Sequence, residues 1–394
     1  MIAPRTLDVT GSRFVATYAI VGPHDAARGR AESIAVEQTI EFPADLVPDD
    51  DVGRHVIGRV ESVVPSGADR SLVRISYAVE TSGGELPQLL NVVFGNCSLY
   101  PGVRLVDLDL PPDLLRRFPG PRFGVPGLRA LLGVPHRPLL TTALKPMGLD
   151  AGAFAEIADV LVRGGIDVIK DDHGLANQPF APWEARVRAC AAAVRSANEA
   201  TGAHSIYMPS LNAPADEIAE RARIARDAGA GGLLVLPGLA GLDTMRWLAA
   251  DETIGLPIMG HPAFLGSFVV GEDAGIEHGL LFGTIFRLAG ADLVVFPSYG
   301  GRFSFDEDAC ASIARACRAP LGDLPPAFPA PGGGMTLDRI AEIHAFYGND
   351  TALLVGGDLH RGDLLANVAR MRSAVETGSA AGSPAAATTG PGVS

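Results

Sequence analysis

The sequence predicts an α/β protein in which a (β/α)8 TIM barrel follows a smaller α+β domain of ferredoxin-like type. Two observations lead to this prediction. From about residue 138, short apolar runs alternate with amphipathic helical patterns, and eight such units occupy about 240 residues. The first 125 residues lack that regular alternation. We therefore expect an N-terminal domain over residues 1–125, a catalytic barrel over residues 126–377 and a tail over residues 378–394.

The N-terminal domain is expected to contain strands or short helices at residues 14–20, 33–41, 55–64 and 72–78. It ends in a cluster that is typical of a junction between domains, because proline and glycine interrupt regular structure. The cluster consists of Pro119, Pro121, Gly124, Pro126 and Gly127.

The barrel strands are expected, in order, at residues 139–144, 167–170, 205–208, 233–236, 257–259, 293–296, 327–330 and 353–355. Apolar residues at helical spacing predict helices between them, over residues 151–163, 182–200, 215–228, 306–318 and 338–346. A doubly wound open sheet is the structural alternative, because alternation alone does not show whether a sheet closes. The final segment, from residue 378, consists almost entirely of small residues and proline, which predicts a disordered tail.

The composition excludes several classes of protein. The net charge is −13 and no Lys/Arg-rich run interrupts it, which argues against nucleic acid and anionic membranes as partners. No apolar run reaches about 18 residues and no signal segment opens the chain, so we expect a cytoplasmic protein. The cysteines form no C-x-x-C pair and predict buried free thiols: Cys97, Cys190, Cys310 and Cys317, the last two spaced to share a helix face.

A short polar run follows the apolar residues 166–169 and reads Lys170-Asp171-Asp172-His173-Gly174. An ammonium group among metal-type ligands would repel a divalent cation. The lysine fits such a site if it is neutral, or if CO2 converts it into a carbamate, whose oxygens suit a hard cation such as Mg2+. A solvated turn of alternating charge is the alternative interpretation.

Polar residues follow the expected strands at the point where each strand ends. In a barrel these carboxyl ends meet at one rim, and that rim carries the active site. The candidate residues are Lys145 after the first strand, Lys170, Asp172 and His173 after the second, Ser210 and Asn212 after the third, His261 after the fifth, and Ser298 and Arg302 after the sixth. Taken singly, Lys145 also fits a side chain that extends to water, and His261 fits a structural histidine.

Two glycine runs follow the seventh and eighth strands: Gly332, Gly333 and Gly334, and then Gly356 and Gly357. Barrels form phosphate sites at these two loops, where backbone N–H groups can approach an anion closely. A single run would fit a flexible turn equally well. Two runs at these positions predict a phosphorylated small molecule as the substrate.

Together these segments resemble the large subunit of ribulose bisphosphate carboxylase/oxygenase (RuBisCO), and more closely its non-carboxylating relatives, the RuBisCO-like proteins of form IV. Residues 164–172 are similar to the family signature G-G-x-D-x-x-K-D-D-E, and Leu144-Lys145-Pro146 matches its first-strand K-P element. The similarity extends to about residue 375 and includes residues 178–180, 257–263, 290–292, 296–298, 94–105 and 120–124.

The resemblance implies a role for each matched residue. Lys170 would be carbamylated by CO2, and its carbamate would bind Mg2+ with Asp172. Lys145 would be the acid/base beside the substrate. Glu37 matches an acidic residue that reaches the site of a neighbouring subunit, which implies a homodimer or larger assembly with shared sites. The phosphate would be held by Gly333, Gly334, Gly356 and Gly357, with Ser298 as a further substrate contact.

The departures from the family pattern limit the reaction. The third metal ligand, a glutamate in the family, is His173, which either favours Mn2+ or Zn2+ or acts as an acid/base. Met147 and Pro262 stand where the carboxylases have cations, and their strand 6 histidine is lost. Their CO2-polarising loop lysine is missing, and Arg302 is the nearest cation. These changes argue against a bisphosphate carboxylase and favour a substrate with one phosphate.

A carbamate-metal site beside a lysine suits a reaction that passes through an enediolate. RuBisCO-like proteins reach it by proton abstraction or by loss of a carboxylate. Because Arg302 and His261 could meet a carboxylate, we favour a decarboxylase or transcarboxylase/hydrolase of a phosphorylated keto sugar acid, of the 3-oxo-isoapionate 4-phosphate type. The alternative is an enolase or isomerase of a methylthio-sugar phosphate. A metal-free binding protein, and an aldolase with a Schiff base at Lys170 or Lys145, also stay open.

Overall fold

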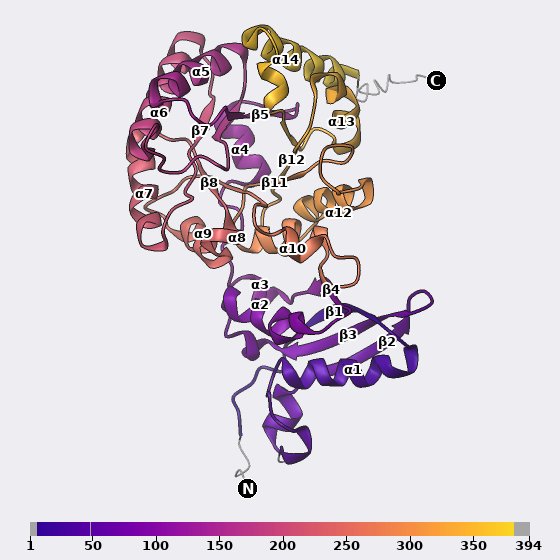
Figure 1. Ribbon diagram of the computed structural model, residues 1–394. Coiled ribbons are helices and arrows are strands. Elements are labelled where there is room, and N and C mark those ends of the chain that lie inside the picture. Colours follow the sequence, from indigo (N-terminus) through magenta and orange to yellow (C-terminus); the bar gives the residue numbers. More distant parts are fainter. Residues whose placement is uncertain (1–5, 48, 382–394) are drawn as a thin grey trace, which may run out of the picture.

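The computed structural model describes residues 6–47 and 49–381. A domain built on one sheet lies at one end of the molecule, and a ring of strands surrounded by helices lies at the other (Figure 1). The N-terminal sheet contains β1 (Arg13–Val21), β2 (Arg59–Pro65), β3 (Arg70–Ala78) and β4 (Val103–Asp109). Its helices are α1 (His24–Glu37) and α2 (Leu86–Phe94), with shorter turns η1 (Ala44–Leu46), η2 (Val52–Val56), η3 (Val79–Ser82), η4 (Asn96–Leu99) and α3 (Pro112–Leu115).

The N-terminal domain has the predicted ferredoxin-like topology. Its elements follow the chain as β-α-β-β-α-β, and its strands lie in the spatial order β4, β1, β3, β2 with antiparallel neighbours. Alternate residues of β1 account for the packing, since Phe14, Ala16 and Tyr18 are buried while the residues between them are partly exposed. The buried Tyr18 hydroxyl donates to the carbonyl oxygen of Val93 at 2.7 Å, which ties the sheet to α2.

Two of the expected N-terminal segments do not match the bounds of single elements in the structure. The segment at residues 33–41 is mostly the second half of α1, which begins at His24. The segment at residues 55–64 is divided between η2 and β2. The first half of α1 buries only the small Ala27 and Ala31 against the sheet, so its sequence lacks the large apolar residues that mark an amphipathic helix.

The barrel contains eight parallel strands within the described part of the chain. They are β5 (Leu139–Leu144), β6 (Val168–Asp171), β7 (Ile206–Met208), β8 (Leu233–Val235), β9 (Ile258–Gly260), β11 (Leu293–Pro297), β12 (Phe328–Gly332) and β13 (Ala352–Leu354). Larger helices lie outside them: α5 (Ala151–Gly164), α6 (Trp183–Thr201), α7 (Ala215–Ala228), α9 (Leu242–Ala250), α12 (Glu307–Arg318), α13 (Ile340–Tyr347) and α14 (Leu364–Ala381). Short turns complete the list: α8 (Pro237–Ala240), α10 (Gly266–Val269), η5 (Gly279–Ile285), α11 (Phe286–Leu288), η6 (Leu337–Arg339) and η7 (Gly357–His360).

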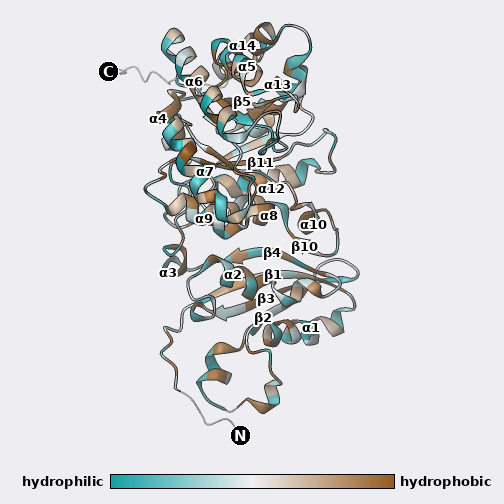
Figure 2. Ribbon diagram, turned by 60° about the vertical axis from the view of Figure 1, so that its left-hand side comes forward, coloured by the Kyte–Doolittle hydropathy of each residue, from teal (hydrophilic) through white to brown (hydrophobic). Residues whose placement is uncertain are grey.

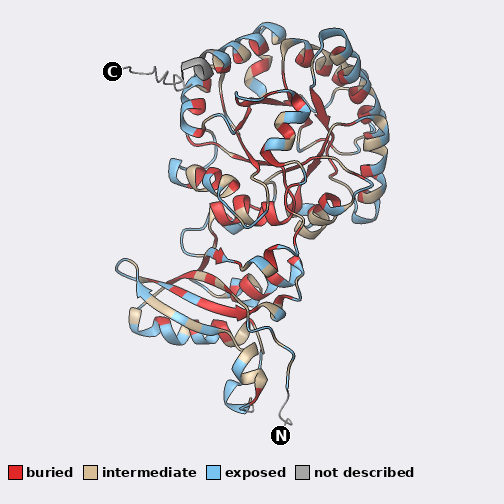
Figure 3. Cartoon of the chain, turned by 180° about the vertical axis from the view of Figure 1, so that it is seen from behind, coloured by how far each residue is buried: buried red, intermediate tan, exposed pale blue. Residues whose placement is uncertain are grey.

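The sheet closes, which rules out the open-sheet alternative. Backbone hydrogen bonds join four strands on each side, in the orders β12-β11-β9-β8 and β13-β5-β6-β7. The bridge between Ser210 and Leu234 connects β7 to β8, and β12 packs beside β13. Viewed along the ring, the strands are buried and the outer surfaces of the helices are exposed (Figure 3). The hydropathy pattern agrees, with polar residues on the outward helix faces (Figure 2).

The predicted junction is partly a helix that belongs to the barrel. Helix α4 (Gly124–Leu132) begins inside the proline/glycine cluster, and its Val125, Leu128 and Leu132 pack into the apolar interior of the barrel. Pro126 fits the first turn of α4, where its missing N–H has no helical partner. The expected boundary between residues 125 and 126 therefore falls within α4, at the closed end of the barrel.

A second connection joins the two domains. The short strand β10 (Gly275–Ile276), from the segment after α10, pairs in parallel with β4 and adds a fifth strand to the N-terminal sheet. The buried Arg104 guanidinium on β4 donates to Glu277 at 3.1 Å, directly after β10. The barrel is thus attached to the N-terminal domain at a site far from α4 in the chain.

The remaining expectations concern the cysteines and the tail. All four cysteines are buried with free thiols, and Cys310 and Cys317 lie on the buried face of α12, as expected. Helix α14 continues to Ala381, so the expected tail from Gly378 overlaps the last turn of that helix. Residues 382–394 lie outside the described residues.

Candidate active site

The carboxyl ends of the barrel strands surround a cavity of about 800 Å³. Its lining includes nearly all of the residues that the sequence singled out: Lys145, Lys170, Asp172, His173, His261, Arg302, Gly333, Gly334, Gly356 and Gly357. These residues come from the first, second, fifth, sixth, seventh and eighth strands or their following loops. Barrel closure therefore assembles one site from segments that span more than half of the chain.

The only two lysines of the chain lie in this cavity. All other basic residues among the 32 Lys and Arg are arginines, yet Lys145 and Lys170 both line the site. Arginine replaces lysine well on a surface, but it does not lose its proton or react as an amine. The placement indicates that both positions need an amino group.

Lys170 is the more enclosed of the two amines. It lies at the end of β6, only 2% exposed, and its Nζ donates to the carbonyl oxygen of Asp171 at 3.0 Å. Burial, with a contribution from the nearby Lys145, lowers the pKa of Lys170 to about 8, against the opposing charge of Asp172. A lysine with this pKa has a substantial neutral fraction near neutral pH, which is the form that combines with CO2.

Asp172 is the centre of a small charge network. Its Oδ2 lies 2.7 Å from Nζ of Lys145, and its Oδ1 lies 3.3 Å from Nδ1 of His173. Burial alone would raise the pKa of Asp172, but hydrogen bonds from His173 and Lys145, with the charge of Lys170, hold it well below its usual value. The carboxylate is therefore ionised and available as an oxygen ligand.

The histidines His173 and His261 stack in parallel, with ring centroids 4.8 Å apart and an interplanar angle of 14°. Nδ1 of His261 accepts from the backbone N–H of Ala263 at 3.2 Å. Burial, together with Lys170 and His173, lowers the pKa of His261 well below its usual value. The ring is thus neutral with its proton on Nε2, where it can serve as a hydrogen-bond donor.

The glycine loops after β12 and β13 also line the cavity, and close packing explains the residue type in the first of them. Gly333 and Gly334 have φ of 79° and 115°, which disfavour a side chain. A Cβ on Gly333 would also lie 3.0 Å from the ring of Phe303. The loops thus bring bare backbone to the cavity surface, as anion binding requires. Sequence reasoning missed Arg361, because it lies beyond the glycine run that marked the loop. Its side chain is largely exposed and forms an ion pair at 3.1 Å with Asp358, which also lines the cavity.

An apolar wall completes the cavity. It includes Phe264, Val269, Phe282, Phe303 and Phe305, from the loops after β9 and β11 and from η5. Phe264 is 74% exposed and has φ of 71°, a conformation that is costly for an aromatic residue. Arg302 lies over the Phe303 ring, 5.1 Å from its centroid. A ligand here would meet both charged and apolar side chains.

Four predicted residues do not line the cavity. Ser210 is fully buried, with its backbone N–H donating to Asp171 at 3.0 Å, and Asn212 lies two residues further on. Ser298 is 1% exposed, and its hydroxyl lies behind β11, 3.3 Å from the Tyr347 hydroxyl, because successive strand residues point to opposite faces. This placement contradicts a substrate contact for Ser298. Glu37 lies at the end of α1 in the N-terminal domain, where its Oε1 accepts from Asn96 at 2.9 Å. It does not reach the cavity of its own chain.

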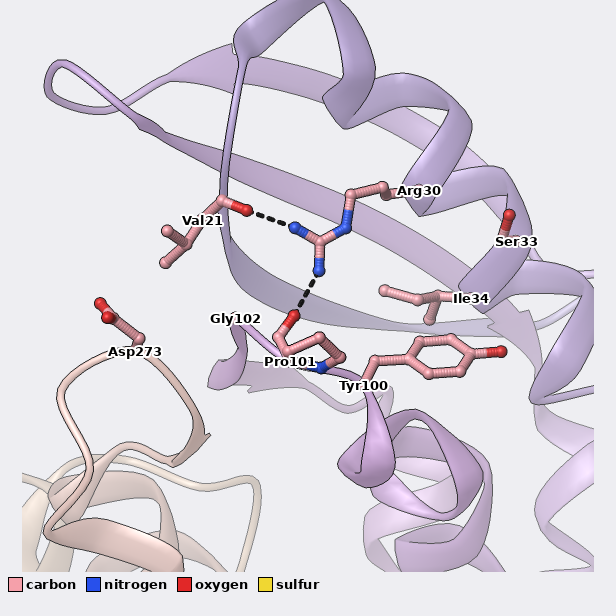
Figure 4. A pocket seen from close by; sticks show the side chains of 8 residues that line it. All are labelled: Val21, Arg30, Ser33, Ile34, Tyr100, Pro101, Gly102 and Asp273. Atoms are coloured by element: carbon pink, nitrogen blue, oxygen red, sulfur yellow. Dashed lines mark hydrogen bonds between the residues drawn. The ribbon is translucent and has the colours of Figure 1, made fainter.

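A second hollow lies in the N-terminal domain, between α1 and the segment before β4 (Figure 4). Its one central cation is already engaged, since the guanidinium of Arg30 donates to the carbonyl oxygens of Val21 and Pro101. Asp273, at its edge, forms an ion pair with Arg70 at 2.8 Å. The barrel cavity is therefore the better candidate for the active site.

The donor set in the cavity fits a divalent cation only after lysine modification. Among the described residues, no cluster of three or more His, Cys, Asp and Glu side chains could hold a metal ion. A carbamate on Lys170 would supply an anionic oxygen beside Asp172 and remove the repelling charge. The free Nε2 of His173 would be the third donor, since its Nδ1 faces Asp172.

Both the closed barrel and the composition of its rim define an enzyme of the RuBisCO large-chain superfamily. The family model "Ribulose bisphosphate carboxylase large chain, catalytic domain" matches residues 124–385. The chain belongs to this family, as a RuBisCO-like protein.

Three characterised or named relatives are similar over most of the chain. It is 42% identical over 347 residues to ribulose bisphosphate carboxylase-like protein 1 of Rhodopseudomonas palustris, covering 88% of this chain and 92% of that one. It is 40% identical to the 5-methylthioribulose-1-phosphate isomerase of Rhodospirillum rubrum, covering 88% and 91%. It is 35% identical to the 2,3-diketo-5-methylthiopentyl-1-phosphate enolase of Geobacillus thermodenitrificans, covering 89% and 88%.

Solved structures agree with the fold. The RuBisCO-like protein of Rhodopseudomonas palustris superposes with a TM-score of 0.84 at 39% identity, covering 92% of this chain and 97% of that one. A dimeric archaeal RuBisCO from Hyperthermus butylicus superposes with a TM-score of 0.84 at 26% identity, covering 95% and 92%.

Within residues 6–47 and 49–381, no helix has both the length and the apolar character needed to cross a membrane.

Proposed function

We propose that this protein is a metal-dependent tautomerase that moves a proton at the carbon beside the carbonyl of a monophosphorylated methylthio-ketose, as an isomerase or an enolase. The observation that carries the proposal is the lining of one cavity, which combines three kinds of group. It holds the charged centre at Lys145 and Asp172, glycine loops suited to a phosphate, and apolar side chains suited to a thioether. The names of the relatives that are 40% and 35% identical support this substrate class.

The chain's own residues account for the chemistry. Carbamylated Lys170, Asp172 and His173 would hold Mg2+ or, given the imidazole, Mn2+ or Zn2+. When bound, such a cation polarises the substrate oxygens and stabilises the charge that develops on enolisation. Nζ of Lys145 would move the proton at the substrate carbon, with Asp172 holding the amine in place. Nε2–H of His261 would donate to a substrate oxygen.

The glycine loops would fix the other end of the substrate. Backbone N–H groups at Gly333, Gly334, Gly356 and Gly357 would bind the phosphate. The Arg361 guanidinium would join them by exchanging its ion pair with Asp358 for the phosphate. Met147 and Pro262 offer no cation for a second phosphate. Binding of the phosphate and of the apolar end of the substrate would hold the reacting carbon beside Lys145.

The site would be completed by a neighbouring subunit. Glu37 and Asn96 are hydrogen-bonded at the surface of the N-terminal domain and lie away from their own cavity. We expect the N-terminal domain of one subunit to cover the cavity of the next, so that this pair reaches the substrate. Excluding water in this way strengthens the electrostatic interactions in the site.

A keto sugar acid phosphate remains a second candidate, because Arg302 and His261 both line the cavity and could bind a carboxylate. The test is to incubate the protein, CO2 and Mg2+ or Mn2+ with each substrate in D2O. Deuterium gain in a product that keeps all of its carbons supports the tautomerase. Loss of a carboxylate carbon supports the sugar-acid reaction. If the protein produces neither change, both candidate functions are contradicted.

The same material separates the remaining alternatives. A metal-free binding protein would take up no Mg2+ or Mn2+ under bicarbonate, and Lys170→Ala would change no activity. An aldolase would form a Schiff base with substrate that borohydride traps. Because the chain has only Lys145 and Lys170, mass spectrometry of the trapped protein would identify the reactive amine directly.

A further inference from the structure

The middle residue of the run Lys170-Asp171-Asp172 faces away from the cavity. Lys170 and Asp172 line the site, whereas the Asp171 side chain is 0% exposed on the opposite side of β6. Strand geometry requires this alternation. Asp171 is therefore a buried carboxylate directly behind the residues that would hold the metal.

Four donors converge on this carboxylate. The Tyr207 hydroxyl donates to Oδ1 at 2.7 Å. The backbone N–H of Ser210 donates to Oδ2 at 3.0 Å, and the Arg186 guanidinium donates to the same oxygen through Nη2 at 3.1 Å and Nε at 3.4 Å. The group joins β6 to the end of β7 and to α6.

Arg186 also fixes the loop that leaves β6. Its Nη2 donates to the carbonyl oxygen of Ala176 at 3.0 Å, and its Nη1 donates to that of Ala181 at 2.9 Å. One buried guanidinium thus holds the strand end and two points of the following loop. Asp172 and His173 lie in the part of the chain between Asp171 and Ala176.

The main chain of Asp171 contacts the Lys170 amine on the cavity side of β6. The carbonyl oxygen of Asp171 accepts from Nζ of Lys170 at 3.0 Å. Arg186, Tyr207 and the Ser210 backbone thus fix the Asp171 side chain, while the Asp171 main chain fixes the Lys170 amine. A fully desolvated ion pair is costly in free energy, and a well-packed apolar pair often serves stability as well or better. The location of this ion pair directly behind Lys170 and Asp172 favours a role in positioning.

We infer that Arg186 is a positioning residue for the metal site, acting through Asp171 to fix the Lys170 amine and the Asp172 and His173 side chains. The inference rests on the proposed function insofar as it concerns a metal. Groups that orient ligands from behind commonly alter metal affinity by about 10–100-fold when they are removed. Arg186 touches no substrate, so its effect reaches the reaction only through the residues that it holds.

A matched control is available in Arg287. It is 1% exposed and, like Arg186, donates to several main-chain carbonyl oxygens, among them those of Ala316 and Ala319 at 2.9 and 2.7 Å. It also donates to the carbonyl oxygens of Leu324 and Pro325, in the segment before β12. Arg287→Met should therefore destabilise the fold without reaching the metal site.

The experiment measures Mn2+ binding by electron paramagnetic resonance, under bicarbonate, in the full chain and in Arg186→Met, Tyr207→Phe and Arg287→Met. Thermal unfolding is followed in parallel. We expect about 10–100-fold weaker binding in Arg186→Met. A smaller loss is expected in Tyr207→Phe, which removes one hydroxyl group and so reports even if Arg186→Met fails to fold. Arg287→Met should keep the wild-type affinity at a lower melting temperature.

A second readout requires no metal. Lysine labelled with ¹³C at Cε gives only two side-chain resonances in this chain, from Lys145 and Lys170. The Lys170 resonance should move or broaden in Arg186→Met and Tyr207→Phe, and stay unchanged in Arg287→Met.

Wild-type Mn2+ affinity and an unmoved Lys170 resonance in the folded Arg186→Met and Tyr207→Phe proteins would overturn the inference. Equal losses in Arg287→Met would also overturn it, because general destabilisation would then suffice. Failure of the wild-type protein to bind Mn2+ contradicts the proposed function instead. In that case a Lys170 shift confined to the Arg186→Met and Tyr207→Phe proteins still supports the positioning of the amine.

Discussion

The amine of Lys145 and the carboxylate of Asp172 form an ion pair of 2.7 Å that joins β5 to the end of β6. The same carboxylate is the predicted metal ligand, so a bound cation and the Lys145 ammonium would compete for its charge. Asp172 therefore links the predicted metal site to the amine that would move the substrate proton.

The first prediction concerns this amine. Lys145→Met should lower kcat by about 10²–10⁴-fold if Nζ moves the proton, with little change in Mn2+ binding. Lys145→Arg, which keeps the positive charge but does not release a proton, should be similarly impaired. Steady-state kinetics and metal titration on the same samples check both parts. Turnover near the wild-type rate in either variant would remove Lys145 from the mechanism.

The second prediction is a pH dependence set by Lys170, whose pKa burial lowers to about 8. Only the neutral amine combines with CO2, so the rate of carbamate formation should rise with pH through about 8 and level off above it. An exposed lysine would reach that plateau only above its ordinary pKa of about 10.4. The check is a titration of ¹³Cε-lysine by NMR, in which the resonance that Lys170→Ala removes should titrate near pH 8.

Much of this architecture could be predicted from the sequence because barrel strands are short, fully buried and regularly spaced. The expected strand at residues 139–144 coincides with β5, and the helix at residues 215–228 coincides with α7. The N-terminal helix α1 was harder to locate because it packs through alanines. The cavity residues could be predicted because they directly follow the strands in the sequence, and the carboxyl ends of barrel strands carry the active site.

Sequence position is a poor guide to the direction of a side chain. Asp171 ends β6 and Ser298 follows β11, yet neither side chain faces the cavity. Asp171 contacts Arg186, and Ser298 contacts Tyr347, on the outer side of the sheet. Arg361 was missed because it lies several residues beyond the end of β13, although the loop places it at the cavity. The partners of a buried polar group come from other elements, so local sequence does not reveal them.

The third prediction concerns the apolar wall. Phe264→Ser should raise KM for a methylthio-ketose phosphate by about 10-fold or more, since the thioether would lose its apolar contact. The same ketose phosphate with a hydroxyl group in place of the thioether should be affected far less. Phe346→Ser, a change at a partly exposed phenylalanine of α13, is the control for a general effect. Equal effects on both substrates would show that Phe264 does not distinguish the thioether from the hydroxyl group.

The fourth prediction tests the shared site. Glu37→Gln and Lys170→Met proteins should each be inactive, because each lacks one contributor to every site. When the two are mixed and exchange subunits, half of the random dimers are mixed and each regains one intact site, so about a quarter of the activity should return. Full activity in the Glu37→Gln protein by itself would contradict a role for Glu37 in the neighbouring site.

The last prediction concerns the other end of the barrel. Asp167, from the family signature, lies before β6 and accepts from Arg137 at 2.6 and 2.7 Å and from the backbone N–H of Leu140 at 2.7 Å. Asp167→Ala would leave the buried Arg137 unpaired, so we expect a loss of about 3–5 kcal/mol in the free energy of unfolding. Because the candidate active site lies at the opposite rim, kcat of the folded protein should stay unchanged. Denaturant unfolding and kinetics measure the two effects separately. The double variant Arg137→Met/Asp167→Leu should recover part of the stability, and a kcat loss in folded Asp167→Ala would show that the two ends of the barrel are coupled.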